Sequence, residues 1–221
     1  MTNIAKEGYP FVGGFLAAGV FLFLWHNRLA DAVGWISFIG AAFCVYFFRD
    51  PQRNPQDDQR FVLSPGDGRV LAVAEENHPF FPAKVKVIRI FLSIFDVHVQ
   101  HAPISGKVAK IEYRRGKFLD ARDPKAAFEN ESNSIYIEGE SKKVVVRQIA
   151  GLIARRIACQ VKVGETVRIG QKLGMIRFGS QVNLYVDSEL EVCVAAGDRV
   201  TSGVSVVAMD KKAIAPPKTS Q

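Results

Sequence analysis

The sequence GETVRIG at residues 164–170 recurs 33 positions later as GDRVTSG at residues 197–203. A second matching pair lies upstream, where PGDGRV at 65–70 parallels PISGKV at 103–108. Both patterns place a valine at a fixed distance from a glycine, the residue that most easily adopts the backbone conformations of tight turns. Two such pairs in one chain indicate a β domain with an internal duplication.

Short β-branched runs separated by glycine surround these segments and predict a mainly β fold. The predicted strands are residues 69–74, 85–95, 107–113, 134–138, 144–149, 160–163, 174–178, 182–186 and 191–194. Glu138-Gly139-Glu140 is typical of a hairpin turn. The polar stretch 116–132 has no strand pattern and is expected to form a loop or a short helix near a site.

The G-[DE]-x-V-x-x-G unit is similar to the turn of lipoyl and biotinyl domains. In that fold, strands of the P-x-x-G-x-V type pair with strands of the G-x-x-V type, so two copies of each predict a duplicated lipoyl/biotinyl-like β sandwich. Those carrier domains have a modified lysine at a hairpin. The corresponding Gly-Ser step, Gly179-Ser180, has no lysine, which favours a chemistry other than carrier attachment.

Residues 1–50 differ from the remainder because they contain two apolar runs, 9–25 and 32–48, joined by a short polar stretch. Each run would extend roughly 25 Å as a helix, slightly less than a ~30 Å hydrocarbon core. We therefore expect a membrane-associated helical hairpin that crosses the bilayer or enters one leaflet. The second apolar run argues against a cleaved signal peptide. A soluble domain is predicted at 51–221.

The distribution of charge also favours a membrane setting. Lys6, Arg49, Arg53 and Arg60 flank the hairpin and outnumber Arg28 in its turn, which predicts that both ends face the cytoplasm. The net charge of +7 favours an anionic membrane surface as partner, and the basic residues lack the interleaved aromatics of single-stranded nucleic-acid platforms. Three cysteines without CxxC spacing predict neither a zinc ribbon nor a disulfide framework.

Four residues are candidates for chemistry. His98 and His101 lie in DVHVQHAP at 96–103, a segment expected to leave the core as an edge or a loop. They could form a metal pair or an acid–base pair, or they could be surface residues. Asp67 lies in a glycine-flanked turn, where it either forms an Asx turn or orients a histidine that serves a hydroxyl. Ser180 is either part of an ordinary β turn or that hydroxyl.

These motifs resemble, in order and spacing, the short bacterial form of phosphatidylserine decarboxylase. The resemblance runs through FFRDP at 47–51, SPGDG at 64–68, FLSIFDVHVQHAP at 91–103, GKFLDA at 116–121, NSIYIEG at 133–139, GLIARRI at 151–157 and RFGS at 177–180. Several separate motifs agree across most of the chain, so the resemblance is far more specific than a Gly-Ser step alone.

The resemblance implies that the proenzyme cuts itself between Gly179 and Ser180. A large β chain, 1–179, and a small α chain, 180–221, would result and remain together as a heterodimer, itself able to dimerise. Ser180 would become a covalent pyruvoyl group, the cofactor that forms a Schiff base with the amino group of phosphatidylserine. Loss of carbon dioxide would then yield phosphatidylethanolamine.

The resemblance also implies individual roles. Asp67 and His101 would activate Ser180 for self-cleavage, and His98 would be the proton donor or electrostatic partner during decarboxylation. No metal is implied. The enzyme would lie on the bacterial inner membrane with its catalytic domain on the cytoplasmic side.

The chain departs from the family pattern in two places. It has Phe-Gly-Ser-Gln where the larger bacterial form has Leu-Gly-Ser-Thr, so a role of that threonine does not transfer. Gly66 replaces the more usual alanine or valine.

Two alternative functions are a membrane-anchored metal hydrolase and a lipoyl-like adaptor with the same duplicated sandwich. Bound zinc would favour the hydrolase, and an intact single polypeptide would favour the adaptor.

Overall fold

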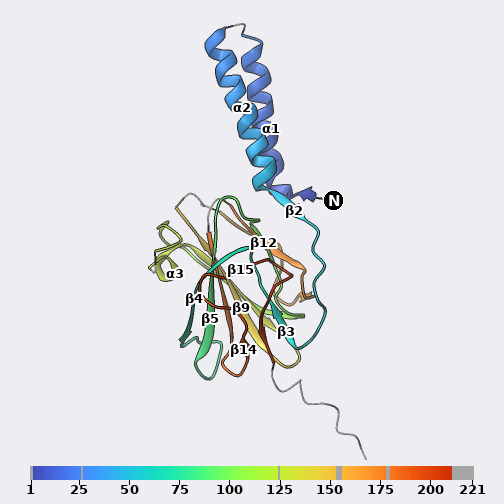
Figure 1. Ribbon diagram of the computed structural model, residues 1–221, viewed down its shortest axis with the longest axis vertical. Helices are drawn as coiled ribbons and strands as arrows, with labels where there is room; N and C mark the ends of the chain where they lie inside the picture. Colours follow the sequence, from blue (N-terminus) through green and yellow to red (C-terminus); the bar gives the residue numbers. More distant parts are fainter. Residues whose placement is uncertain (1, 26, 124, 153–155, 178–179, 211–221) are drawn as a thin grey trace, which may run out of the picture. The chain divides into compact units, whose positions relative to one another are not determined.

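A computed structural model of the chain describes residues 2–25, 27–123, 125–152, 156–177 and 180–210. The chain forms two compact units, Met1–Gln52 and Arg53–Gln221. The first is a helical hairpin and the second is a β domain (Figure 1).

The first unit consists of a one-turn 3-10 helix (Lys6–Gly8) and two longer helices, α1 (Tyr9–Phe23) and α2 (Arg28–Phe47). Strands β1 (Thr2–Ile4) and β2 (Arg49–Pro51) pair antiparallel beside them. The turn between the helices is shorter than expected, because α2 begins at Arg28 instead of residue 32. Asn27 explains the early start, since its Oδ1 accepts a hydrogen bond of 2.9 Å from Leu29 N and caps the helix.

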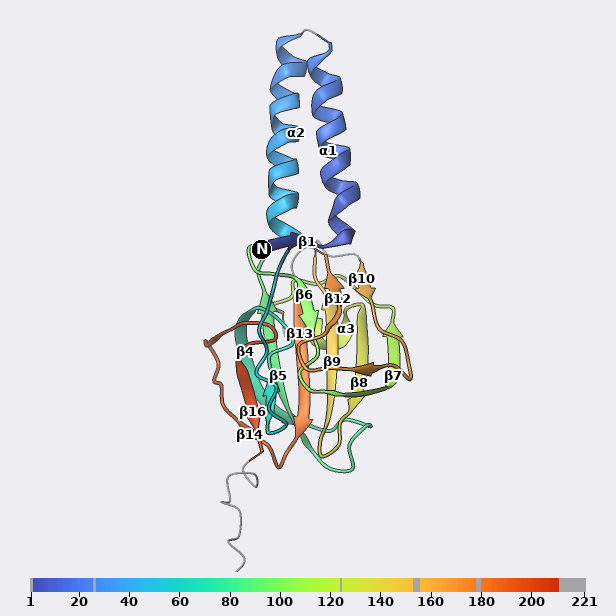
Figure 2. The ribbon, with the colours of Figure 1, turned by 90° about the vertical axis from the view of Figure 1, so that its right-hand side faces the viewer.

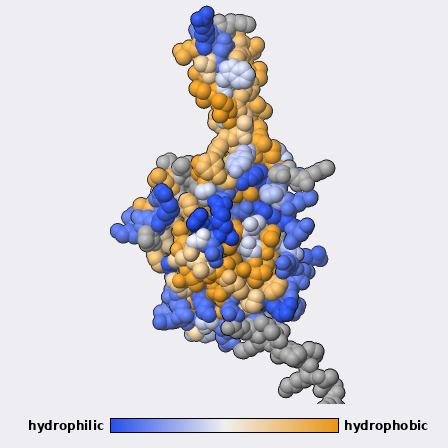
Figure 3. Space-filling model, in the orientation of Figure 1, coloured by the Kyte–Doolittle hydropathy of each residue, from blue (hydrophilic) through white to orange (hydrophobic). Residues whose placement is uncertain are grey.

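The two helices approach closely where both lack side chains. A Cβ added to Gly19 would lie 3.3 Å from the carbonyl oxygen of Gly34, the kind of small-residue contact that packs helices in membranes. The outer surface of the hairpin is apolar along most of its length (Figure 3), with Phe21, Trp25 and Ile36 more than half exposed. Among the described helices, α2 alone is long and apolar enough to cross a membrane.

The second unit contains an antiparallel eight-stranded sheet with the order β11-β7-β8-β9-β13-β5-β4-β15. Its strands are β4 (Gly68–Glu76), β5 (Val85–Leu92), β7 (Gly106–Arg114), β8 (Ser132–Glu138), β9 (Lys143–Ala150), β11 (Thr166–Val167), β13 (Ser180–Asp187) and β15 (Arg199–Val200). Two three-stranded sheets, β10-β12-β6 and β14-β16-β3, complete the domain (Figure 2). Their strands are β3 (Phe61–Leu63), β6 (Val99–His101), β10 (Ile157–Cys159), β12 (Lys172–Ile176), β14 (Glu191–Val192) and β16 (Val206–Met209).

The predicted duplication is confirmed by the strand pairing. β11 pairs with β7 and β15 pairs with β4, so each G-x-x-V strand lies against a P-x-x-G-x-V strand. In both copies the glycine at the fourth position of the P-x-x-G-x-V motif is opposite the valine, as Gly106 is to Val167 and Gly68 to Val200. The strand order of the large sheet therefore reads as two equivalent halves that meet between β9 and β13.

The main core lies between the large sheet and the two small ones. Alternate residues of a strand share a face, and Val182, Leu184 and Val186 of β13 are all fully buried in this core. Tyr185 points to the other face, where it packs with Phe81 and other residues in a smaller cluster.

Three local predictions have different outcomes. The predicted strand 160–163 is wrong, since the strand in this region is β10 at 157–159. Glu165 N donates a hydrogen bond to Lys162 O, and the turn that this bond closes occupies the end of the predicted strand. The stretch 116–132 does contain a short helix, α3 (Ala126–Glu129). The segment 96–103 forms an edge strand, β6, but it is buried in the core.

Candidate active site

Ser180 is the first residue of β13 and is paired with Leu92 of β5 on one side and Ala150 of β9 on the other. It shares the inner face of the sheet with Val182. The side chain is fully buried, and its Oγ has no hydrogen-bond partner within the described part of the chain. An unpaired buried hydroxyl is costly and calls for a reason beyond folding. Gly179 and residue 178 lie outside the described residues.

The SPGDG loop lies beside Ser180. A Cβ added to Gly66 would be 3.5 Å from Leu92 Cδ1 and 3.6 Å from Val182 Cγ2. Because Leu92 is the direct neighbour of Ser180 across the sheet, this contact brings the Asp67 turn to the end of β13. The space around Gly66 would also accommodate the methyl group of an alanine.

Asp67 is held by two donors. Its Oδ1 accepts a hydrogen bond of 2.7 Å from Ser202 N, and Arg53 Nη2 lies 3.1 and 2.8 Å from its two oxygens. Burial raises the pKa of the Asp67 carboxyl above its ordinary value, against the opposing effects of the Ser202 N–H and the Arg53 charge.

His101 lies at the end of β6 and is almost completely buried. Its N–H donates to Pro65 O at 3.1 Å, which fixes β6 against the SPGDG loop. Its Nδ1 lies 2.8 Å from Ser202 Oγ. Asp67 and His101 therefore share Ser202 as a partner. Ser202 was not singled out from the sequence, although it occupies the sixth position of the repeated turn at 197–203.

His98 precedes β6 and is fully buried. Its Nδ1 lies 2.9 Å from Asp96 O, and a carbonyl oxygen can only accept, so this nitrogen carries the hydrogen. Asp96 is itself fixed, because its Oδ2 accepts hydrogen bonds from Ser93 N at 2.8 Å and Ser93 Oγ at 2.7 Å. The His98 carbonyl accepts from Ile176 N at 3.3 Å, which connects it to the strand that leads toward Ser180.

A chain of buried amides joins β6 to the large sheet. Gln148 Nε2 donates to Gln100 Oε1 at 2.8 Å, and Asn133 Nδ2 donates to Gln148 Oε1 at 3.0 Å. Gln148 is opposite Val182, so it lies on the same face as Ser180 and close to it. Nothing in the sequence pattern marked these amides, since their pairing depends on contacts between distant strands.

The other half of the duplication offers an internal comparison. Phe91 is opposite Arg69 of β4, and Glu138 is opposite Lys107 of β7, so Phe91 and Glu138 are equivalent. Phe91 is also opposite Gln181, and Glu138 is opposite Lys143. The residue equivalent to Ser180 is therefore the one before Lys143, namely Lys142.

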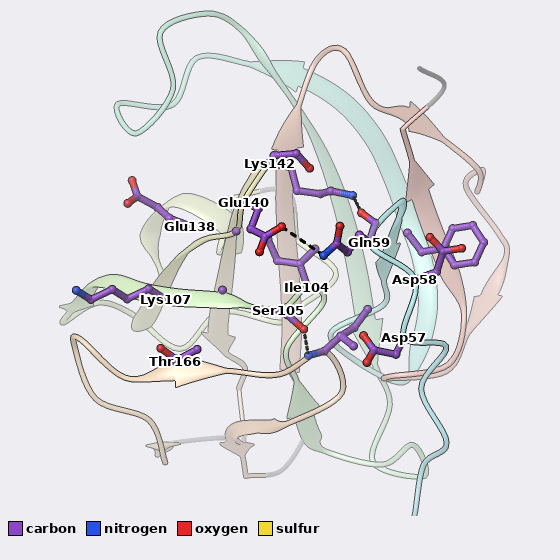
Figure 4. Close-up of a pocket in the computed structure, with 15 residues that line it drawn as sticks. Asp57, Asp58, Gln59, Ile104, Ser105, Lys107, Glu138, Glu140, Lys142 and Thr166 are labelled. Carbon is purple, nitrogen blue, oxygen red and sulfur yellow. Dashed lines mark hydrogen bonds between the residues drawn. The ribbon is translucent and has the colours of Figure 1, made fainter. Parts of the chain in front are cut away.

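A pocket of about 430 Å³ lies around this second location, bordered by Lys142, Gln59 and Ser105 among others (Figure 4). Lys142 Nζ donates to the Gln59 carbonyl, and burial lowers the pKa of this amine. Ser105 Oγ accepts from Ile169 N at 2.8 Å, which matches the bond from Ser202 N to Asp67 in the other half. Among the residues that the structure describes, the half that contains Ser180 is the one that places a carboxylate and a histidine at this turn.

Comparison with known proteins gives one consistent family. The phosphatidylserine decarboxylase family model matches residues 41–208. Proteins named phosphatidylserine decarboxylase proenzyme from Geotalea uraniireducens, Citrifermentans bemidjiense and Magnetococcus marinus are each 40% identical to the chain. The alignments cover 93%, 93% and 91% of this chain and 96%, 96% and 93% of those proteins. The matched region contains Asp67, His98, His101 and Ser180.

Proposed function

Because the chain belongs to the phosphatidylserine decarboxylase family, and is therefore a decarboxylase, we propose that it makes its own prosthetic group by cleaving the bond between Gly179 and Ser180. The observation that carries the proposal is the buried Ser180 Oγ, which lacks a hydrogen-bond partner among the described residues and lies beside the Asp67 turn. A buried hydroxyl that no described residue engages in a hydrogen bond is available for reaction.

The cleavage requires one base. His101 takes the Ser180 Oγ proton as the oxygen attacks the Gly179 carbonyl carbon, and the proton passes to the departing amide nitrogen as the C–N bond breaks. In the resulting ester, the base, free again, takes the Cα proton of residue 180, and the Gly179 carboxylate leaves from Cβ as a Cα=Cβ double bond forms. This enamine shifts to the imine, water adds to the imine carbon, and the nitrogen of residue 180 leaves as ammonia. A pyruvoyl group remains at the start of the small chain.

The surroundings of Ser180 fit such a group. Leu92, Ala150 and Val182 are buried apolar neighbours, and loss of the serine hydroxyl breaks no hydrogen bond that is described. The pyruvoyl carbonyl supplies an electron sink once it has condensed with the amino group of phosphatidylserine. His98, with its Nδ1 hydrogen on Asp96 O, presents Nε2 as the nitrogen that exchanges a proton with the substrate carbon.

The apolar hairpin supports a position at the bilayer, where the substrate lies. Its exposed aromatic and aliphatic side chains favour insertion, and the net charge of +7 favours a surface rich in anionic lipid. We infer a location on the inner membrane with the catalytic domain on the cytoplasmic side.

Intact mass measured on the purified protein tests the self-cleavage. We expect the wild type to yield two species, the smaller one spanning residues 180–221 and blocked at its amino end, whereas Ser180→Ala remains full length. Ser188→Ala is the matched control, because Ser188 is exposed in the turn after β13 and should not affect cleavage. A wild type that stays full length, indistinguishable from Ser180→Ala, would rule the proposal out.

A further inference from the structure

The Ser202 hydroxyl is placed so that only one arrangement of hydrogens satisfies it. Its Oγ lies 2.9 Å from Pro65 O and 2.8 Å from His101 Nδ1, and the side chain is fully buried. The Pro65 carbonyl can only accept, so the single hydroxyl hydrogen points to it. The lone pair of Oγ must then accept a hydrogen from His101 Nδ1. His101 is thereby protonated at Nδ1, and Nε2 becomes the nitrogen that accepts protons.

The duplicated turn indicates that the fold does not need this hydroxyl. Ile169 occupies the position equivalent to Ser202, and its backbone N–H bonds to Ser105 Oγ at 2.8 Å. The backbone N–H of Ser202 makes the equivalent bond to Asp67 at 2.7 Å. The turn thus has a backbone donor and a side-chain acceptor in both copies, and the isoleucine in one copy shows that the donating residue needs no hydroxyl of its own. A buried hydroxyl costs free energy unless it is paired, and the Ser202 hydroxyl pairs with Pro65 O and His101 Nδ1.

We propose that Ser202 is a positioning residue that fixes the tautomer of His101 as the base for self-cleavage. The inference rests on the proposed function, because it assigns His101 as that base. Asp67 acts on His101 indirectly. Its carboxylate accepts the hydrogen bond from Ser202 N and so fixes the turn, and the turn places the Ser202 hydroxyl against the His101 imidazole.

The position of Ser202 in the chain gives this contact a second consequence. Cleavage before residue 180 would leave Ser202 on the small chain, and Asp67, Pro65 and His101 on the large one. The orientation of His101 in the mature enzyme then depends on the small chain staying in place. The pairing of β15 with β4, through Arg199 and Val200, holds the turn there.

Nitrogen NMR of the full-length protein, labelled with ¹⁵N-histidine in detergent, tests the tautomer directly. The Ser180→Ala background prevents cleavage, and the chain has only four histidines. We expect His101 to be protonated at Nδ1, and Ser202→Ala to shift a substantial fraction to the Nε2-protonated form. Ser205→Ala is the matched control, because Ser205 Oγ accepts from Thr201 N at 2.9 Å in the same turn and should leave His101 unchanged.

The rate of fragment formation in the chain with Ser180 provides the second measurement. We expect Ser202→Ala to slow cleavage by about ten-fold, a part of the ~10²–10⁴-fold that a general base contributes, because the base is retained but wrongly protonated for part of the time. Ser205→Ala should cleave at the wild-type rate.

Two results would overturn the inference: a His101 that stays fully Nδ1-protonated in Ser202→Ala, or a cleavage rate that this substitution leaves unchanged. If Ser202→Ala does not fold, Ser202→Thr replaces it, and loss of the Nδ1-protonated form despite the retained hydroxyl would also contradict the inference. Failure of the proposed function is distinguishable, because the wild type would then not fragment at all, whatever the NMR result.

Discussion

His98 and His101 are both buried, but they are oriented by different groups. A main-chain carbonyl, Asp96 O, fixes His98, whereas a side-chain hydroxyl, Ser202 Oγ, fixes His101. The first contact lies within the loop after β5, and the second joins segments that self-cleavage would separate. We therefore expect the two histidines to serve different steps.

Replacement of each histidine by alanine tests this division. His101→Ala should accumulate uncleaved chain, with cleavage slower by about 10²–10⁴-fold, because the base is lost. His98→Ala should cleave but release little carbon dioxide from phosphatidylserine. His78→Ala is the control, since the His78 ring packs on Tyr185 at 4.6 Å in the smaller cluster and should affect neither step. Cleavage that fails in His98→Ala and persists in His101→Ala would reverse the assignment.

Arg53 and Asp67 form an ion pair whose side chains are each about one-sixth exposed, and its removal has a calculable dependence on pH. Burial raises the pKa of Asp67 in the folded state above its value in the unfolded chain. Protonation of Asp67 therefore adds to the free energy of unfolding. This contribution is complete below the unfolded-state pKa and is lost as the pH rises through the higher folded-state pKa. Arg53→Met should raise this pKa further. At neutral pH it should lower the free energy of unfolding by about 1–3 kcal/mol, less than for a fully buried pair.

Urea unfolding of the uncleaved Ser180→Ala protein, at pH 7 and near pH 4, measures this effect. The loss caused by Arg53→Met should shrink at the lower pH, where a larger fraction of Asp67 is protonated, and Asp67→Asn should recover part of it at pH 7. Arg60→Met removes the partner of the more exposed Asp58 and should change stability little. An equal loss at both pH values would show that Arg53 acts by packing and not by charge.

At the level of elements, the sequence was sufficient where a local rule determines the structure. The repeated motifs and their likeness to lipoyl-like turns predicted that strands of the G-x-x-V type pair with strands of the P-x-x-G-x-V type. The structure confirms this, because β11 pairs with β7 and β15 with β4. The boundary at β10 was wrong because Val161 and Val163 favour a strand by residue type, yet a turn between Lys162 and Glu165 ends the pairing earlier. Propensity does not include that tertiary competition.

The candidate site shows the same limit. Asp67, His98, His101 and Ser180 were found because their motifs are local in sequence. Ser202 was missed, because its significance lies in contacts to residues more than a hundred positions away. In the sequence, Ser202 differs from Ile169, the residue at the same position of the matching turn. That difference indicates a role for the hydroxyl only when the two turns are known to have equivalent structures.

The pairing of β12 with β10 requires a glycine at position 174. This strand lies between β10 and β6, with an irregular register next to Gly174. A Cβ there would lie 2.1 Å from the Ala158 carbonyl oxygen, so Gly174→Ala should force β10 and β12 apart. We expect a loss of about 1–3 kcal/mol in unfolding free energy. Cleavage should also slow, because Lys172 of the same strand pairs with His101 of β6.

Thermal or urea unfolding together with fragment analysis checks this expectation. Gly66→Ala is the control, because its added Cβ would meet Leu92 and Val182 at ordinary contact distances of 3.5 and 3.6 Å. It should cleave normally. A Gly174→Ala protein as stable as the Gly66→Ala protein would mean that the strands adjust without cost and that β12 does not constrain the site.

On the scale of the whole molecule, the duplication produces two equivalent turns with different chemistry. One turn has Ser105 and Ile169 beside Lys142, and the other has Asp67 and Ser202 beside Ser180. The shared backbone bond maintains the fold in both halves, so the side chains of one half are free to serve a reaction. This division explains how a symmetric sheet can carry a candidate active site in one of its halves.

The same sheet predicts the fate of the two chains after cleavage. The small chain would contribute β13, which is paired along its length with β5 on one side and β9 on the other. Val182, Leu184 and Val186 are fully buried, and each contributes roughly 1.5–3 kcal/mol by its removal from water.

We therefore expect the fragments to co-elute in gel filtration in mild detergent and to separate only when the protein is denatured. Ser180→Ala, which should elute at the same volume as one intact chain, is the control. Fragments that separate without denaturant would show that the peptide bond before Ser180 holds β13 in place, and they would also remove Ser202 from His101 in the mature enzyme.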